Sequence, residues 1–282
     1  MTLEDDLSLL LDTIQKAGGL AKQLFRTPLK SWEKDPGHSV TEADIAVDGL
    51  IHTALMTARP QYGWLSEETA EGPERLDSAR IWVVDPIDGT RAFMKGRAEF
   101  SVSIALVENG TVVLGAVMDP MTGQIFSAQK DRGAFCDRKP TQVSARRDLE
   151  GARVLIDPST LKTKYWQSPW PEMAMTKPNS IALRLAWVAA GHHDAMLTVS
   201  AKNCWDIAAG VLLVEEAGGT VGDYAGRKMR VEARKPEIPP MVAGGAALFC
   251  DLQPRLAGAV AAWQADKARK HQGSAKNDDQ KK

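Results

Sequence analysis

The dipeptide Asn109-Gly110 places the strongest constraint on how this chain can fold. It stands between two apolar segments, Ser101–Val107 and Thr111–Met118. Asn-Gly readily adopts the positive φ values that a two-residue hairpin turn requires. Upstream, the short apolar run Ile81–Val84 predicts a further, buried strand. We therefore expect an antiparallel sheet in the first half of the chain, continued through turns at residues 122–123 and 132–133.

Helical periodicity precedes this sheet. Apolar residues recur at steps of three and four from Leu3 to Phe25, which predicts an amphipathic helix. A second helix is expected from Thr41, a favoured N-cap residue, to a stop at Pro60. The polar segment 30–38 separates the two helices.

The second half alternates predicted strands with predicted helices. The strands are Arg153–Ile156, Ala195–Val199, Thr220–Tyr224 and Pro240–Ala243, and the helices are Ser180–Ala190, Asp206–Ala217 and Ala246–Trp263. This order indicates an α+β first half followed by an α/β second half. We expect two subdomains, residues 1–148 and 149–265. Residues 266–282 contain no aromatic and no aliphatic residue larger than alanine, which predicts a disordered tail.

Composition narrows the class of protein. Lys and Arg number 35 against 36 Asp and Glu, a balance that argues against a nucleic-acid binder. No stretch approaches the length of a membrane span, so no membrane association is expected. The three cysteines form no CxxC pair and indicate neither a disulfide framework nor a zinc site. A cytoplasmic protein is the expectation.

Several catalytic chemistries lack their motifs. The chain contains no GxxxxGK[ST], GxGxxG, GxSxG or HExxH segment, and its five histidines are scattered except for one adjacent pair. An aspartyl-phosphate mechanism requires DxD, which occurs nowhere in the sequence. The candidate chemistry that remains is catalysis that relies on the oxygen atoms of carboxylates.

The segment Asp85-Pro86-Ile87-Asp88-Gly89-Thr90 carries the strongest chemical signal. A buried strand delivers Asp85 at its C-terminal end, and Asp88 follows in the turn. Two carboxylates and a backbone carbonyl there would suit Mg²⁺, and a helix starting at Gly89-Thr90 would offer free N–H groups to a phosphate. The alternative is a turn in which both acids merely cap backbone N–H groups.

Other acids lie in comparable settings. Glu67 and Glu68 follow Gly63-Trp64-Leu65-Ser66. Asp206 begins an Ala- and Gly-rich helix, where it is either a ligand or a simple N-terminal acid. Asp44, three residues after Thr41, is also compatible with an N-terminal capping arrangement.

Three segments together resemble the motifs of the inositol monophosphatase superfamily, which also contains bisphosphate nucleotidases and fructose-1,6-bisphosphatases. They are residues 67–69 (EET), 82–93 (WVVDPIDGTRAF) and 204–210 (CWDIAAG). The resemblance covers roughly residues 7–263. It implies a layered αβαβα sandwich and a lithium-sensitive, Mg²⁺-dependent phosphomonoesterase. It also implies a small phosphorylated substrate and a homodimer.

The resemblance assigns metal ligands residue by residue. Glu67, Asp85 and the Ile87 carbonyl would hold one Mg²⁺, while Asp85, Asp88 and Asp206 would hold a second. A third, weaker ion would lie near Glu67. Such converging carboxylates need cations, because burying their uncompensated charge together is costly.

The same resemblance assigns the chemistry. Asp44, Glu67 and Thr90 are the expected catalytic residues, with Thr90, backed by Asp44, orienting a metal-activated water for attack on phosphorus. The expected substrate-binding residues are Asp88, Gly89, Thr90, Ser180, Arg184 and Asp206. Whether Lys34 and Glu68 belong to the site is left open.

The substrate is the least constrained expectation. Inositol-phosphate phosphatases carry a sugar-binding glutamate about seven residues before the motif aspartate, where this chain has Val199. Arg184 lies where bisphosphate nucleotidases of the superfamily tend to have a lysine; it would bind a second phosphate, or it is an arginine on the surface of its helix. Hydrolysis of 3′-phosphoadenosine 5′-phosphate to AMP is therefore favoured. Inositol 1-phosphate and histidinol phosphate remain alternatives, as does a metal- or nucleotide-binding protein on a retired phosphatase scaffold.

Overall fold

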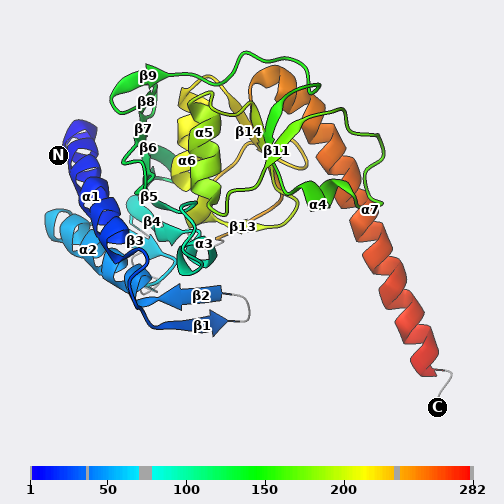
Figure 1. Ribbon diagram of the computed structural model, residues 1–282, viewed down its shortest axis with the longest axis horizontal. Helices are drawn as coiled ribbons and strands as arrows, with labels where there is room; N and C mark the ends of the chain where they lie inside the picture. The colour runs from blue at the N-terminus through cyan, green and yellow to red at the C-terminus, as the bar shows by residue number, and fades with distance from the viewer. Residues whose placement is uncertain (1, 36–37, 70–77, 232–235, 280–282) are drawn as a thin grey trace.

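A seven-stranded sheet forms the framework of the first half of the chain (Figure 1). The computed structural model describes residues 2–35, 38–69, 78–231 and 236–279. In spatial order the strands are β3 (Gly63–Ser66), β4 (Arg80–Asp88), β5 (Ser101–Glu108), β6 (Thr111–Met118), β7 (Ile125–Gln129), β8 (Ala134–Cys136) and β9 (Lys139–Thr141). All neighbours are antiparallel except β3 and β4. The predicted hairpin is confirmed, with Asn109 at φ 50° and Gly110 at φ 78°.

Helices cover both faces of this sheet. They are α1 (Leu3–Leu24) and α2 (Glu42–Ala58) on one face, and α5 (Ile181–Ala189) and α6 (Cys204–Glu216) on the other. The side chains of β4 alternate accordingly, because Trp82 and Val84 pack in the α1–α2 core whereas Ile81 and Val83 pack in the α5–α6 core. Both faces of β4 are therefore buried, which explains its unbroken apolar run.

Helix α6 approaches the sheet unusually closely at Gly115 on β6. A Cβ atom at Gly115 would lie 2.9 Å from the Cα of Ala209. The small residues on both sides permit this approach, which places the N-terminal end of α6 beside β4 and β5.

A second sheet and α7 complete the layers. Its strands, in spatial order, are β11 (Ala174–Thr176), β10 (Arg153–Leu155), β12 (Ala195–Leu197), β16 (Met241–Gly244) and β14 (Thr220–Asp223). Leu248, Leu252 and Leu256 of α7 (Ala246–Asp279) pack on its outer face. The order of layers is helix, sheet, helix, sheet, helix, so the predicted αβαβα sandwich is confirmed. Because α6 packs on the first sheet, the division at residue 148 stays a prediction.

In the structure α7 continues through Asp279; residues 280–282 lie outside the described part. The disordered tail expected from residue 266 stays a prediction. The start of this extension is tethered, since Asp266 accepts hydrogen bonds from Lys164 Nζ at 3.1 Å and Tyr165 Oη at 3.0 Å. Figure 1 shows the helix projecting from the body of the protein.

Smaller elements surround the sheets. The polar segment expected only to separate the first two helices forms a hairpin of β1 (Ser31–Asp35) and β2 (His38–Thr41). The remaining elements are α3 (Thr90–Met94), α4 (Pro158–Leu161), β13 (Lys202–Asn203) and β15 (Glu237–Ile238). None of the described helices has the length and apolarity needed to cross a membrane.

Candidate active site

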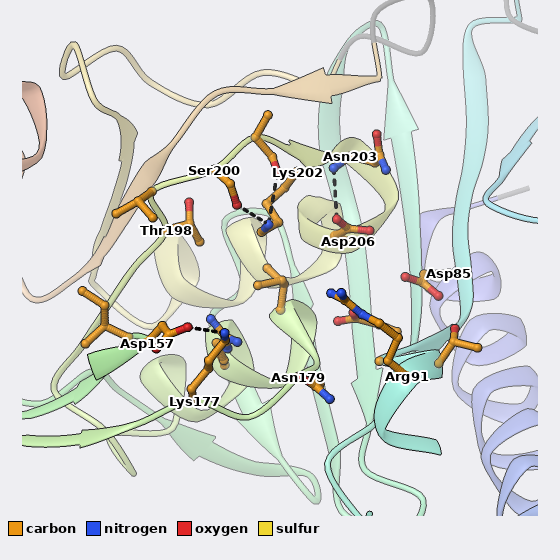
Figure 2. A pocket seen from close by; sticks show the side chains of 18 of the residues that line it. Asp85, Arg91, Asp157, Lys177, Asn179, Thr198, Ser200, Lys202, Asn203 and Asp206 are labelled. Atoms are coloured by element: carbon orange, nitrogen blue, oxygen red, sulfur yellow. Dashed lines mark hydrogen bonds and ion pairs between the residues drawn. The ribbon is translucent and has the colours of Figure 1, made fainter. Parts of the chain in front are cut away.

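Four carboxylates from three parts of the fold meet at one cavity of about 700 Å³; Figure 2 labels two of them, Asp85 and Asp206. Glu67 follows β3, Asp85 and Asp88 lie near the end of β4, and Asp206 lies in the first turn of α6. We call these four residues the acid cluster. Helix α6 begins at Cys204, two residues earlier than predicted, because Asn203 rather than a later residue is its N-cap.

A β-bulge in β4 orients Asp85 and Asp88 toward the cavity. Asp85 pairs with Ser103 and Asp88 pairs with Ser101, so β4 has one residue more than β5 between these points. In a regular strand, residues three apart face opposite sides, and the extra residue allows both acids to reach the cavity. Pro86 fits there because a bulge leaves a residue without its usual ladder hydrogen bond.

Gly89 turns the chain directly after this bulge. Its φ of +102° is rare for other residues, and a Cβ atom there would lie 2.9 Å from the Glu99 carbonyl oxygen. The turn starts the short helix α3 at Thr90, and both residues line the cavity. The predicted strand-to-helix junction is confirmed.

Asp88 is anchored from behind by the start of α5. Its Oδ2 accepts hydrogen bonds from Ser180 Oγ at 2.7 Å and from the Ala182 N–H at 2.6 Å. Ser101 Oγ lies 2.9 Å from Ser180 Oγ and donates to it, since the Ser180 proton is used on Asp88. Ser180, predicted to bind substrate, is fully buried behind Asp88.

Asp44 and Thr90 form a second polar unit beside the cavity. Asp44 caps α2 by accepting from the Thr41 N–H at 2.8 Å, as the capping interpretation expected. Its other oxygen accepts from Thr90 Oγ1 at 3.0 Å, and Thr90 Oγ1 also lies 3.1 Å from the Ile87 carbonyl oxygen. Both interpretations of Asp44 are therefore compatible with one geometry.

The acid cluster has the properties of a cation site. Burial, followed by the charge of Glu67, raises the pKa of Asp85 well above its ordinary value. Burial and then Asp206 raise the pKa of Glu67 to about 8 and that of Asp88 to about 7. Asp85 Oδ1 is buried and accepts no hydrogen bond from any residue that the structure describes. A buried, unsatisfied oxygen among hard anionic donors fits Mg²⁺.

The carboxylates of the acid cluster do not yet surround a single metal position. Within the described ranges, no three His, Cys, Asp or Glu side chains already stand at metal-ligating spacing. Because like charges repel one another at low dielectric, we expect the carboxylates to draw together only when cations bind.

We predict that metal-free protein loses stability as the pH rises from about 4 to about 8. The folded state holds protons on Glu67 and Asp88 that the unfolded chain releases near its ordinary carboxyl pKa values, so raising the pH favours unfolding. Mg²⁺ should restore the lost stability by replacing those protons. Melting temperatures with chelator and with Mg²⁺ test this, with KCl of equal ionic strength as control. Parallel pH profiles in Mg²⁺ and in chelator would contradict it.

The cavity also carries basic residues, on which the charges of Asp206 and Asp88 act. Figure 2 shows Lys177 and Lys202 on the side away from Asp85, and Arg184 also lines the cavity; we call Lys177, Arg184 and Lys202 the basic wall. Lys177 is paired with Asp157. Val199, with 40% of its surface exposed, lines the cavity at the position discussed for the sugar-binding glutamate.

Sequence reasoning missed most of this lining. Besides two members of the basic wall, it missed the cavity residues Ser39, Arg91, Lys95, Arg97, Asp157, Asn179, Thr198, Ser200 and Asn203. They come from β2, α3, β13 and several loops that meet only in the folded protein, and apart from Arg91, which stands in the motif at residues 82–93, no local motif marks them. The rule that sites form beyond the C-terminal ends of strands could have directed attention to the segments after β11 and β12.

The open question about Lys34 and Glu68 has a geometric answer. Lys34 Nζ donates to the Glu67 carbonyl oxygen at 2.9 Å and forms an ion pair with the Glu68 carboxylate. Both residues therefore lie beside a member of the acid cluster, although neither is among the residues lining the cavity.

A layered αβαβα fold with a buried acid cluster beside the β4–α3 junction is typical of metal-dependent phosphatases. The chain belongs to the inositol monophosphatase family, whose family model matches residues 3–262. This confirms the predicted family and assigns the chain to a group of phosphatases whose members generally use Mg²⁺ and act on small phosphorylated substrates.

Individual relatives agree with this assignment. Over 231 residues the chain is 33% identical to the Nus factor SuhB of Escherichia coli (strain K12), covering 78% of this chain and 85% of the relative. Over 237 residues it is 35% identical to the inositol-1-monophosphatase of Rhizobium meliloti (strain 1021), covering 80% and 88%. The crystal structure of the extragenic suppressor protein suhB from Bartonella henselae has a TM-score of 0.79 at 30% identity, covering 89% and 98%.

Proposed function

We propose that this protein is a Mg²⁺-dependent phosphomonoesterase for small substrates that carry a second anionic group, with 3′(2′),5′-bisphosphate nucleotides as the leading candidates. The observation that carries the substrate preference is the state of two cations in the basic wall. Neither Arg184 nor Lys202 has a carboxylate oxygen within ion-pair distance in the described part of the chain.

Both cations are held by neutral oxygens only. Arg184 is 6% exposed, and its Nε donates to the Pro178 carbonyl at 2.7 Å. Lys202 is half-buried, and its Nζ donates to Ser200 Oγ at 2.9 Å and to the Ala201 carbonyl at 3.1 Å. Burial lowers the pKa of both groups. The charge of Asp88 on Arg184 and that of Asp206 on Lys202 oppose this lowering only in part. Cations removed from water are costly without a counter-charge in direct contact, and an anionic ligand would supply one.

The balance of charge in the cavity supports the same preference. Two Mg²⁺ ions would neutralise the four carboxylates of the acid cluster, so Arg184 and Lys202 would keep a net positive charge in the loaded enzyme. An inositol ring would present only hydroxyl groups to these two cations. A second phosphate would accept charge-assisted hydrogen bonds from both, and Arg184 could bind it bidentately.

The acid cluster and the Ile87 carbonyl are the residues that would hold the ions. When bound, Mg²⁺ supplies an acidified water as nucleophile and stabilises the charge on the leaving oxygen. Thr90 Oγ1 would accept a hydrogen bond from the attacking water and pass its own proton toward Asp44. Burial raises the pKa of Asp44, which makes this carboxylate a stronger base. The N–H groups of Gly89 and Thr90 would bind phosphate oxygens.

Other candidate functions have their own support. The name of the Rhizobium meliloti relative favours inositol 1-phosphate as the substrate. The relatives named Nus factor SuhB support the alternative of a binding protein on the same scaffold. A cytoplasmic location and a homodimeric state remain predictions from the sequence.

A phosphate-release panel separates these candidates. It compares 3′-phosphoadenosine 5′-phosphate, inositol 1-phosphate, fructose 1,6-bisphosphate and histidinol phosphate, each with Mg²⁺ and with chelator. We expect the highest kcat/KM for the nucleotide. Equal slow rates on all four substrates would contradict the nucleotide preference, and no Mg²⁺-dependent release from any would favour the binding protein.

Replacing Lys202 with methionine should lower kcat/KM for 3′-phosphoadenosine 5′-phosphate about tenfold, since a charge-assisted hydrogen bond contributes roughly 1.5 kcal/mol or more. The rate on inositol 1-phosphate should change less than about twofold. Lys139→Met, at the far edge of the first sheet, serves as the control. Equal losses of kcat/KM on both substrates would show that Lys202 does not bind the second anionic group of the nucleotide.

A further inference from the structure

Asp48 is a buried acid that no step of the proposed reaction uses. It lies on α2, one turn beyond Asp44, and is only 5% exposed. Its Oδ1 accepts a hydrogen bond from Ser66 Oγ at 2.5 Å, and its Oδ2 accepts one from Thr69 Oγ1. A single carboxylate thus joins α2 to two hydroxyl groups of one loop.

The two residues that carry these hydroxyls, Ser66 and Thr69, flank Glu67 in the sequence. Ser66 immediately precedes Glu67, and Thr69 follows Glu68. Ser66 Oγ also accepts a hydrogen bond from the Glu68 N–H at 3.2 Å, which extends the link from Asp48 to the backbone of the loop. On the other side, the Glu67 N–H donates to the Val84 carbonyl at 3.2 Å. The loop is therefore fixed between β4 and Asp48.

We propose that Asp48 is a positioning residue that sets the place of the Glu67 carboxylate and thereby the Mg²⁺ affinity of the acid cluster. The proposal rests on the proposed function in one respect, namely that Glu67 is a metal ligand. It goes beyond it by assigning a role to a residue outside the cavity.

The chemistry of the link calls for a carboxylate. Both hydroxyls donate, and an ionised carboxylate can accept from both at once, whereas a carboxamide has one accepting oxygen and one donating nitrogen. The negative charge has a small cost, because Asp48 adds to the effects of burial and of Asp44, which raise the pKa of Glu68. The ion pair of Glu68 with Lys34 offsets that cost.

The position of Asp48 also couples two parts of the site. Asp44, which would orient the attacking water through Thr90, lies one turn earlier on the same helix. A rigid α2 therefore sets the distance between Thr90 and the loop of Glu67. Precise placement of ligands and water is what metal catalysis requires, and hydrogen bonds behind the ligands commonly provide it.

Mg²⁺ binding to the full-length protein, measured by calorimetry with Mg²⁺ as the only ligand, tests the proposal. Asp48→Ala should weaken Mg²⁺ binding about 10- to 100-fold, the effect typical of removing a group that orients a metal ligand. Asp48→Asn, which keeps one accepting oxygen, should lie between Asp48→Ala and the wild type. At saturating Mg²⁺, kcat of both variants should remain within about threefold of the wild type.

Asp6→Asn is the matched control for general destabilisation. Asp6 is fully buried and accepts hydrogen bonds from Arg59 Nε at 2.6 Å and Tyr62 Oη at 2.8 Å, on α1 and away from the loop. This variant should lower the melting temperature and leave the Mg²⁺ dissociation constant within about twofold. Should Asp48→Ala melt early yet bind Mg²⁺ like the wild type, Asp48 has only a structural role and the proposal fails.

The calorimetric readout keeps the two proposals distinguishable. If the wild type binds Mg²⁺ but releases no phosphate from the panel, the proposed function fails while the comparison of Asp48 variants still stands. If Asp48→Ala and Asp6→Asn weaken Mg²⁺ binding equally, the positioning role is refuted whatever the activity. Absence of Mg²⁺ binding in the wild type would overturn both.

Discussion

Replacing Asp88 with asparagine should abolish phosphate release at saturating Mg²⁺, with a loss of about a thousandfold or more. Such a loss corresponds to roughly 4 kcal/mol of transition-state stabilisation, the scale expected when a metal that neutralises charge on phosphate loses a ligand. The melting temperature should change little. Activity assays over a Mg²⁺ series, together with circular dichroism, measure both quantities.

The fold should survive because of how Asp88 is anchored. Asp88 Oδ2 accepts from Ser180 Oγ and the Ala182 N–H, and the oxygen of an asparagine amide can take over both bonds. The amide nitrogen then points toward the acid cluster, where it is a donor without a free lone pair for a metal. The substitution therefore removes a ligand while preserving the start of α5.

Asp119→Asn is the matched control. Asp119 is likewise buried, and its Oδ1 accepts from the backbone N–H groups of Met121 at 2.8 Å and Thr122 at 3.2 Å, but it lies in the turn after β6 and outside the cavity. Its variant should keep wild-type turnover. An Asp88→Asn protein with near wild-type turnover would remove Asp88 from the metal ligands.

Replacing Asp44 with asparagine should lower kcat about 100- to 1,000-fold while changing the half-saturating Mg²⁺ concentration less than about threefold. An asparagine can still cap α2 through its oxygen, but its amide nitrogen would face Thr90 Oγ1 and could not take a proton from it. General-base assistance of this kind is typically worth two to four powers of ten. Initial rates across Mg²⁺ and substrate concentrations separate the two parameters.

Variants of Thr90 provide the matched comparison. Thr90→Ser keeps the hydroxyl that joins the attacking water to Asp44 and should retain most activity. Thr90→Val keeps the shape without the hydroxyl and should resemble Asp44→Asn. A large loss of Mg²⁺ affinity in Asp44→Asn, with normal turnover at saturation, would instead make Asp44 a metal ligand.

Local signals were sufficient for most of the framework. The Asn109-Gly110 turn predicted its hairpin because positive φ is a property of the residues themselves. Thr41 and Asp44 predicted the start of α2 because a capping box is formed within four consecutive residues. Gly89 marked the junction of β4 and α3, because glycine readily adopts the positive φ that this turn requires. The acid cluster could be named because each member stands in a recognisable short motif.

Other parts of the chain were less readable from local signals. The composition of residues 266–282 predicts a disordered tail, and this stays a prediction beside a structure in which α7 is drawn through Asp279. The hairpin of β1 and β2 was not predicted, because its polar strands lack the alternating apolar pattern of a half-buried sheet.

The sequence by itself determined the family, the layered fold and the acids that would hold cations, because these features are encoded in short segments with their own conformational or chemical preferences. Only the tertiary structure decided what surrounds those acids. Lys202 and Arg184 face the same cavity although they lie on different elements, and Asp48 meets Ser66 and Thr69 across 18 and 21 positions of sequence. Such contacts depend on how whole layers pack, and no local pattern records that packing.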